Sequence, residues 1–217
     1  MRILITAGPT WERVDAVRYI GNRSSGKLGV ALSQAAAGAG HTVTLLAGPQ
    51  VAEPMWPDGC ETCCVHRFES CDDLRHLVGE HFCSHDVLVM AAAVADYRPS
   101  QVIDGKRPRQ DDEGSESGAW DLRLVPTPDL VEEVVKGKRA DQRVVSFALE
   151  DSAVLEQRAL AKLVSKGVDG IVANPLETIG ANEIQPVWIA ADGSRDMPGR
   201  MDKSDFAYWL MEKIKRL

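Results

Sequence analysis

The sequence lacks any apolar run of about 18 residues, the minimum for a membrane-spanning helix, and it has no recognisable signal peptide. Basic residues are also fewer than acidic ones: the chain has 25 Lys and Arg against 32 Asp and Glu, which gives a net charge of -7. Nonspecific affinity for nucleic acid comes largely from basic residues that neutralise phosphates. We therefore expect a cytoplasmic protein with neither nucleic-acid nor membrane partners.

Cysteine is scarce, and its count of five is odd. Without a secretion signal, this number favours free thiols over a disulfide framework. Cys60, Cys63, Cys64, His66 and Cys71 lie close together in sequence, but two C-x-x-C pairs are not present. Cys63 to Phe68 also alternates as a short strand would. We do not predict zinc here.

The usual nucleotide-binding signatures are missing. Gly21, Gly26 and Lys27 fit G-x-x-x-x-G-K, but Leu28 stands where a P-loop needs a hydroxyl for magnesium. The dinucleotide fingerprint G-x-G-x-x-G is absent after Gly8. No Tyr-x-x-x-Lys pair occurs either, which disfavours a short-chain reductase.

What the chain does have is a polar loop from Gly8 to Gly29, between an apolar run at Ile3 to Ala7 and an alanine-rich helical stretch. A strand, a polar loop and a helix start together favour anion binding, because backbone N–H groups and the positive helix end face the ligand. The candidate anion-binding groups are Thr6, Gly8, Thr10, Arg18, Ser24, Ser25, Gly26 and Lys27. The alternative is that Ser24 or Ser25 merely caps the helix.

Strand and helix patterns alternate along the chain, which predicts a doubly wound α/β fold with a mostly parallel sheet and helices on both faces. Length favours one domain over 1–217. The expected strands are 3–7, 42–46, 64–68, 86–90, 143–147, 170–173 and 186–190, and the expected helices are 26–39, 71–82, 128–136, 152–166 and 203–217. Thr127 or Asp129 is the expected cap of the third helix.

The charged and glycine-rich segment at about 98–124 interrupts this alternation and reads as a flap or arm. Trp120 to Val125 looks like the strand that returns from it. Before the segment, Ala91 to Asp96 follows a buried strand, and ligands bind at the carboxyl ends of such strands. Its small residues Ala92, Ala93 and Ala95 leave room for a flat base. Asp96 is a candidate magnesium ligand, although it could instead cap a helix or pair with Arg98.

The stretch TAGPTWERVDAVRYIGNRSSGKLG closely resembles the pattern of phosphopantothenoylcysteine synthetases, the second half of the bacterial bifunctional coenzyme A biosynthesis flavoprotein. The resemblance continues through VTLLAGP, MAAAVADYRP, SFALE and KGVDGIVAN, so it covers most of the chain. It implies a Rossmann-like sheet and a homodimer, with the arm taking part in dimer contacts. It also implies a pathway partner, a flavin-dependent decarboxylase domain or protein, whereas this chain itself is not expected to bind flavin.

The implied reaction joins 4'-phosphopantothenate to L-cysteine through an acyl-cytidylate. The resemblance implies CTP as the nucleotide donor, with Mg2+ as the cofactor bound with CTP. The resemblance assigns catalytic roles to Asn22, which would hold the acyl-cytidylate, to Arg18, and to Lys106 on the flap. Arg18 has an alternative role in a salt bridge to Asp15 or Glu12. Further nucleotide-binding residues that it implies are Phe147, Lys162, Lys166 and Asn174. Phe147 is equally suited to the core.

Two departures from the family pattern matter. Lys106 aligns with the first lysine of a K-x-K-K flap, but Arg107, Pro108 and Arg109 follow it, and Arg does not replace Lys freely in a shaped site. Thr127 stands where the family often carries asparagine. These changes leave open a rival from another class, a CTP-binding regulatory module without turnover. Spacing alone does not separate CTP from ATP.

Overall fold

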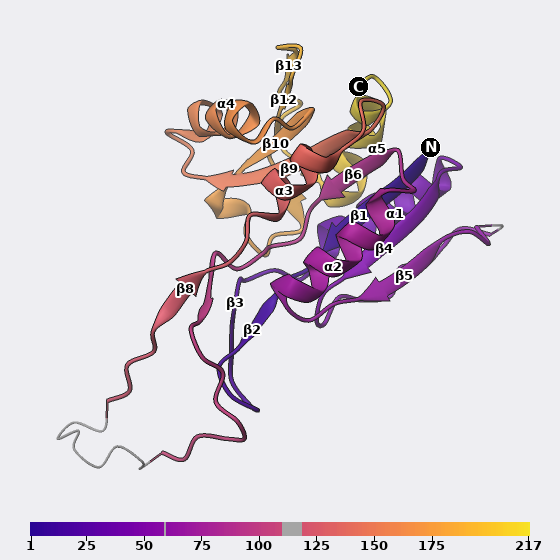
Figure 1. Ribbon diagram of the computed structural model, residues 1–217. Coiled ribbons are helices and arrows are strands. Elements are labelled where there is room, and N and C mark those ends of the chain that lie inside the picture. The colour runs from indigo at the N-terminus through magenta and orange to yellow at the C-terminus, as the bar shows by residue number, and fades with distance from the viewer. Residues whose placement is uncertain (59, 110–118) are drawn as a thin grey trace.

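The computed structural model describes residues 1–58, 60–109 and 119–217, so the middle of the predicted arm lies outside the described residues. An eight-stranded sheet runs in the order β13-β12-β10-β9-β6-β1-β4-β5 (Figure 1). Its strands are β1 (Arg2–Ala7), β4 (Thr42–Ala47), β5 (Cys64–Arg67), β6 (Val87–Met90), β9 (Arg143–Glu150), β10 (Gly170–Pro175), β12 (Val187–Ala190) and β13 (Arg195–Asp196). The β10–β12 and β12–β13 pairs are antiparallel, and the other pairs of this sheet are parallel in the described residues. The predicted α/β class and mostly parallel sheet are confirmed.

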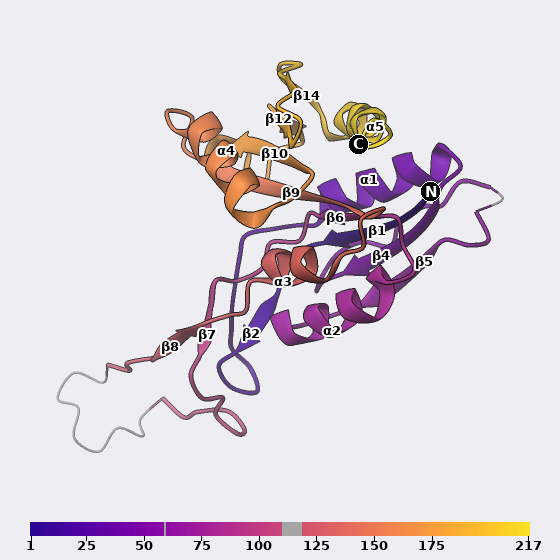
Figure 2. The same cartoon turned by 45° about the horizontal axis from the view of Figure 1, so that its top comes forward.

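Helices cover both faces of the sheet. They are α1 (Lys27–Gly38), α2 (Cys71–Phe82), α3 (Leu130–Gly137), α4 (Leu155–Lys166) and α5 (Lys203–Ile214). Successive strand residues point to opposite faces, so Ile3 and Ile5 pack with α1 and α5, whereas Leu4 packs with α2, α3 and α4. Figure 2 shows α1 and α5 on one side of the sheet and α2 on the other. This coverage suits parallel strands, which are buried on both faces.

Several predicted boundaries need correction. The strand that begins at Arg143 continues to Glu150, and α4 begins at Leu155 instead of residue 152. Asp129 caps α3, since its carboxylate accepts a hydrogen bond of 3.1 Å from the Glu132 N–H. Thr127 does not share this capping role; its hydroxyl donates to the Ala95 carbonyl at 2.6 Å.

The start of α1 contradicts the serine-cap alternative. Its N-cap is Gly26, in the left-handed region with φ of 69°, and no side chain caps the helix. One turn on, a Cβ at Gly29 would stand 2.3 Å from the Ala7 Cβ. Glycine is required there because α1 lies so close to β1.

Short strands appear that the sequence pattern did not predict. Within the predicted anion loop, β2 (Trp11–Arg13) and β3 (Tyr19–Gly21) form a hairpin, and the Trp11 and Tyr19 rings stack 3.9 Å apart. At the base of the arm, β7 (Tyr97–Pro99) pairs with β8 (Leu124–Pro126), so the predicted return strand is reduced to its last residues. Two further strands, β11 (Glu183–Ile184) and β14 (Met201–Asp202), pair before α5, and a 3-10 turn, η1, covers Leu176–Thr178.

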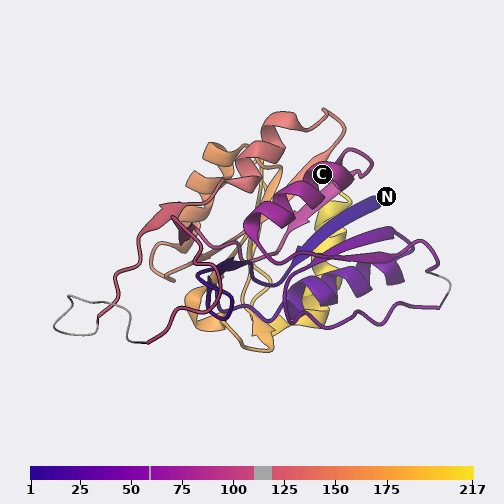
Figure 3. The same ribbon diagram turned by 60° about the horizontal axis from the view of Figure 1, so that its bottom comes forward.

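The arm leaves the sheet at the end opposite to both chain termini (Figures 1 and 3). Its base is bonded to the turn of the β2–β3 hairpin. Ile103 N–H donates to the Val14 carbonyl at 3.0 Å, and Ala16 N–H donates to the Gly105 carbonyl at 2.9 Å. Hairpin and arm base therefore form one substructure. In the described ranges, no helix is long and apolar enough to cross a membrane.

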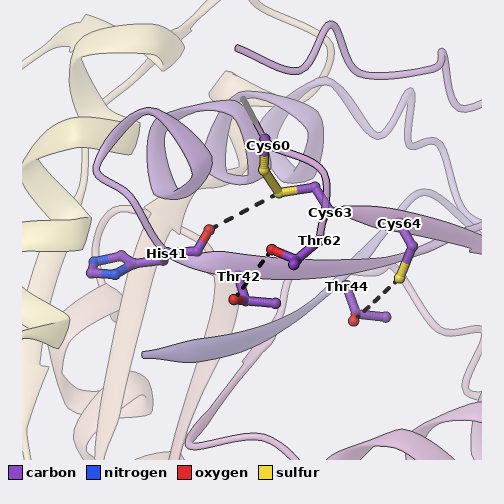
Figure 4. The surroundings of a disulfide bond; sticks show 7 residues. All are labelled: His41, Thr42, Thr44, Cys60, Thr62, Cys63 and Cys64. Atoms are coloured by element: carbon purple, nitrogen blue, oxygen red, sulfur yellow. Dashed lines mark hydrogen bonds between the residues drawn. A yellow bond between two sulfur atoms is a disulfide. The ribbon is translucent and has the colours of Figure 1, made fainter. Parts of the chain in front are cut away.

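The expectation of five free thiols is wrong for two cysteines. Cys60 and Cys63 form a disulfide just before β5 (Figure 4). Their C-x-x-C spacing places the Cα atoms 5.6 Å apart, within disulfide reach. The other three cysteines, Cys64, Cys71 and Cys83, are free.

Candidate functional site

The candidate site lies at the carboxyl ends of β1, β6, β9 and β10. The direction in which successive strands are added to the sheet reverses between β1 and β6, and such a switch point opens a crevice for ligands. The loops after β1 and β6 are hydrogen-bonded to each other there. Ala93 N–H donates to the Gly8 carbonyl at 2.8 Å, and Thr10 N–H donates to the Ala93 carbonyl at 3.3 Å.

Two threonine hydroxyls, one at the end of β1 and one in the loop that follows it, add further hydrogen bonds between these segments. Thr6 accepts from the Ala92 N–H at 3.0 Å, and Thr10 accepts from the Ala95 N–H at 3.0 Å. Both threonines are fully buried. Gly8 and Thr10, predicted as nucleotide ligands, line neither chamber of the cleft described next; their contacts shape the loops that do.

The cleft has two chambers, of about 590 Å³ and 340 Å³. The larger one lies beside the start of α1, and its lining contains these predicted residues: Asn22, Ser24, Ser25, Gly26, Lys27, Ala92, Ala93, Phe147, Lys162 and Asn174. The smaller one contains Ala92, Ala95, Asp96, Phe147, Lys162 and Lys166. Because Ala92, Val94, Phe147 and Lys162 border both, the chambers are adjacent, and we treat them as one cleft.

Asparagine side chains contribute polar atoms to the larger chamber. Asn22 is exposed, and its Nδ2 donates to the Val94 carbonyl at 2.8 Å, so the amide lies over the loop that follows β6. Asn174 is only 6% exposed, and its Oδ1 has no hydrogen-bond partner among the described residues. A buried acceptor without a partner is costly, which makes it a candidate contact for a ligand donor.

The two lysines of α4 are tied to carboxylates. Lys162 Nζ lies 2.7 Å from Glu150 Oε1, and Arg158 lies 2.8 Å from the other oxygen of the same carboxylate. Hydrogen bonds from Lys162 and then Arg158 hold the pKa of Glu150 below its usual value. Lys166 pairs with Asp129. The positive charge of α4 at the cleft is thus largely neutralised within the protein.

Arg18 and Lys106, two of the three predicted catalytic residues, line neither chamber. Arg18 pairs with Asp15 at 2.5 Å, as its alternative role required, and donates to the Arg107 carbonyl at 3.4 Å. The buried Asp15 also accepts from the Val17, Arg18 and Arg107 N–H groups, and the Val17 bond is the largest cause that lowers its pKa. Lys106 is exposed, and both of its chain neighbours are bonded to the hairpin turn.

Asp96 is exposed and lines the smaller chamber. The suggested pair with Arg98 is not formed, because Arg98 pairs with Asp72 at 2.5 Å. In the part of the chain that the structure describes, no group of three His, Cys, Asp or Glu side chains is arranged to hold a metal. Asp96 therefore contributes a single carboxylate.

Sequence reasoning missed several residues of the cleft. Lys203, the first residue of α5, lines the larger chamber, as does the turn at Thr178 to Gly180. One signal for Lys203 was available: a cation in the first turn of a helix opposes the helix dipole. Pro128 lines the smaller chamber, as does Thr127, which the sequence had already marked as a departure from the family pattern.

Comparison with known proteins gives a consistent result. A family model described as the DNA/pantothenate metabolism flavoprotein C-terminal domain matches residues 1–217. The coenzyme A biosynthesis bifunctional protein CoaBC of Bacillus subtilis is 34% identical over 220 residues, covering 99% of this chain and 51% of the relative. The Mycobacterium bovis CoaBC is 39% identical over 224 residues, covering 98% and 51%. The chain thus spans about half the length of these relatives.

Among solved structures, the crystal structure of the C-terminal domain of a CoaBC bifunctional protein superimposes with a TM-score of 0.80 at 31% sequence identity. The match covers 99% of this chain and 94% of that domain.

Proposed function

Because this chain belongs to the family of the DNA/pantothenate metabolism flavoprotein C-terminal domain, the phosphopantothenoylcysteine synthetase domain of CoaBC proteins, we propose that it is a CTP-dependent phosphopantothenate–cysteine ligase. It activates 4'-phosphopantothenate as an acyl-cytidylate and couples it to L-cysteine. The products are 4'-phosphopantothenoylcysteine, CMP and pyrophosphate.

The observation that carries this proposal is the two-chambered cleft at the switch point of the sheet. Its chambers share Phe147, whose ring offers a face to a nucleobase. The larger chamber adds the helix start at Gly26 and Lys27, suited to a phosphate. In this proposal, the cleft binds the nucleotide and the elongated acid together.

The proposed chemistry needs no nucleophile from the protein. A substrate carboxylate oxygen attacks the α-phosphorus of CTP, and the bond to pyrophosphate breaks. The cysteine amine then attacks the acyl carbonyl, the bond to CMP breaks, and the amine loses its proton. Asn22 has an amide donor that is suited to the anhydride oxygens once it turns from the Val94 carbonyl. Positioning and charge stabilisation supply the catalysis.

Two charged residues have supporting roles in this proposal. Mg2+ commonly binds one or two carboxylates together with substrate phosphates, so Asp96 fits as its protein ligand at the triphosphate; the ion would neutralise phosphate charge there. Lys106 supplies a point charge from the arm, and Asp15 and Arg18 hold its neighbours in place.

We also propose a fold type, a domain organisation, a location and partners for this chain. Six parallel strands in the order β5-β4-β1-β6-β9-β10 match the doubly wound, Rossmann-like arrangement. We treat residues 1–217 as one domain with an insertion at about 98–124 that takes part in a homodimer. The cytoplasm is the proposed location, and a decarboxylase domain or partner protein is the proposed consumer of the product.

The test is pyrophosphate release from CTP, with ATP in parallel, in the presence of 4'-phosphopantothenate, with and without L-cysteine. We expect pyrophosphate release with CTP and formation of CMP and coupled product only when cysteine is present. Binding of CTP without turnover under all conditions would contradict the ligase and favour the regulatory module.

A further inference from the structure

Two lysines meet at the end of the larger chamber that lies between α1 and α5. Lys27 is the first residue of α1, and Lys203 is the first residue of α5. Both line the chamber. Their ammonium groups are held by adjacent loop residues: Lys27 Nζ donates to Asn182 Oδ1 at 3.2 Å, and Lys203 Nζ donates to the Ala181 carbonyl.

Both of these partners are neutral oxygens. Over residues 1–58, 60–109 and 119–217, no carboxylate forms a salt bridge with either lysine. The position is also unfavourable for a cation, because the start of a helix carries positive charge. Burial, and then the charge of Lys27, lower the pKa of Lys203. Fold stability alone does not favour two like charges here.

A second observation also indicates a ligand. Asn174 lines the same chamber, is 6% exposed, and its Oδ1 has no partner in the described part of the chain. Two cations, two helix starts and an unmatched acceptor complement a ligand that carries a phosphate group and a hydrogen-bond donor, such as a hydroxyl or an amide.

We propose that Lys203, together with Lys27, forms a subsite for a phosphate group of a substrate. The proposal rests on the proposed ligase function, in which both CTP and 4'-phosphopantothenate carry such a group. It adds Lys203 to the binding residues and assigns the charge at this end of the chamber to one of these two phosphorylated substrates.

The test compares steady-state kinetics of wild type, Lys203→Gln and Lys203→Arg. We expect Lys203→Gln to raise the KM of one phosphorylated substrate about ten- to a hundredfold, with kcat within about twofold. Lys203→Arg should restore most of the affinity. The control is Lys215→Gln, which removes the same charge at the far end of α5, where Lys215 pairs with Glu212; it should leave both KM values unchanged.

The substrate whose KM rises identifies the source of the phosphate. Unchanged KM values for both substrates, or an equal rise in both, would overturn the proposal. If Lys203→Gln does not fold, Lys27→Gln provides the same test, because Lys27 is exposed.

The kinetic test needs an active wild type. Absence of turnover would contradict the ligase, not the subsite. Calorimetric binding of inorganic pyrophosphate to wild type and Lys203→Gln then decides: weaker binding by the variant supports the subsite, and equal binding overturns it.

Discussion

The two sides of the cleft carry positive charge in different ways. On the α4 side, Lys162 and Lys166 each pair with a carboxylate of the protein. On the side of α1 and α5, Lys27 and Lys203 donate to neutral oxygens, and neither forms a salt bridge with a carboxylate of the described residues. Counting lysines near a cleft would treat the two sides as equal.

The difference separates structural cations from those available to a ligand. A cation already paired with a buried carboxylate must break that pair to bind phosphate, and an unpaired buried carboxylate is costly. Lys27 and Lys203 give up only hydrogen bonds to neutral groups. We therefore expect substitutions of Lys27 and Lys203 to change ligand binding, and substitutions on the α4 side to change the stability of the fold.

The largest effect is expected at Asn22, which lines the larger chamber of the cleft. Replacing Asn22 with Ala removes the amide assigned to the reacting anhydride, and we expect kcat to fall about 10²-fold, the typical loss of one such donor. Because Asn22 is exposed, the unfolding midpoint should stay near that of wild type. A kcat of this variant equal to that of wild type would contradict a catalytic role for Asn22.

The next largest effect concerns stability on the α4 side. Lys162→Gln leaves the buried Glu150 with Arg158 alone, and we expect a loss of about 1 kcal/mol in the free energy of unfolding. The matched control is Lys136→Gln on α3, whose partner Glu132 has a side chain that is 47% exposed; the change in its free energy of unfolding should stay below about 0.5 kcal/mol. If urea titrations show equal losses in the free energy of unfolding for the two variants, the Glu150 pair is no more stabilising than the exposed pair, which would contradict this prediction.

Sequence reasoning was most successful where apolar periodicity is strong. The two core clusters reflect the alternation of strand residues such as Ile3, Leu4 and Ile5, and α2 has the predicted bounds because its apolar positions and capping box agree. The β2–β3 hairpin was missed because each strand has only three residues, too few to show an alternating side-chain pattern, so backbone pairing defines them.

The site shows the same limit. The glycine-containing loop after β1 and the alanine run after β6 located the cleft, because a parallel sheet places the carboxyl ends of its strands together. The pairing of Arg18 with Asp15, and the approach of Lys203 to Lys27, join elements whose geometry only the fold supplies. The motif identified Arg18 but not its contacts, and no motif identified Lys203.

Acid should weaken the α4 side. The folded pKa of Glu150 is below its usual 4.5, so its ion pairs stabilise the fold fully above about pH 4.5, and this stabilisation is lost as pH falls through the folded pKa. We expect urea titrations to show wild type more stable than Glu150→Gln at neutral pH. The gap should narrow as pH falls below about 4.5. A gap independent of pH would contradict this assignment.

The smallest effect is expected from Lys27→Gln without ligand. Removing its charge relieves Lys203, whose pKa lies below its usual 10.5. A lysine with a lowered folded pKa destabilises the fold at neutral pH, and this penalty disappears as pH rises through the folded pKa towards 10.5. We expect thermal unfolding at neutral pH to show a gain of up to about 0.5 kcal/mol. A loss of stability would show that the Asn182 hydrogen bond outweighs the repulsion.

Activation of the acid as an acyl-cytidylate is tested most directly by following oxygen from substrate to product. With 4'-phosphopantothenate labelled with 18O in its carboxylate, CTP and L-cysteine, we expect one labelled oxygen in the CMP formed, because the carboxylate oxygen that attacks the α-phosphorus stays with CMP. CMP without label, or label in inorganic phosphate, would contradict activation of the acid as an acyl-cytidylate.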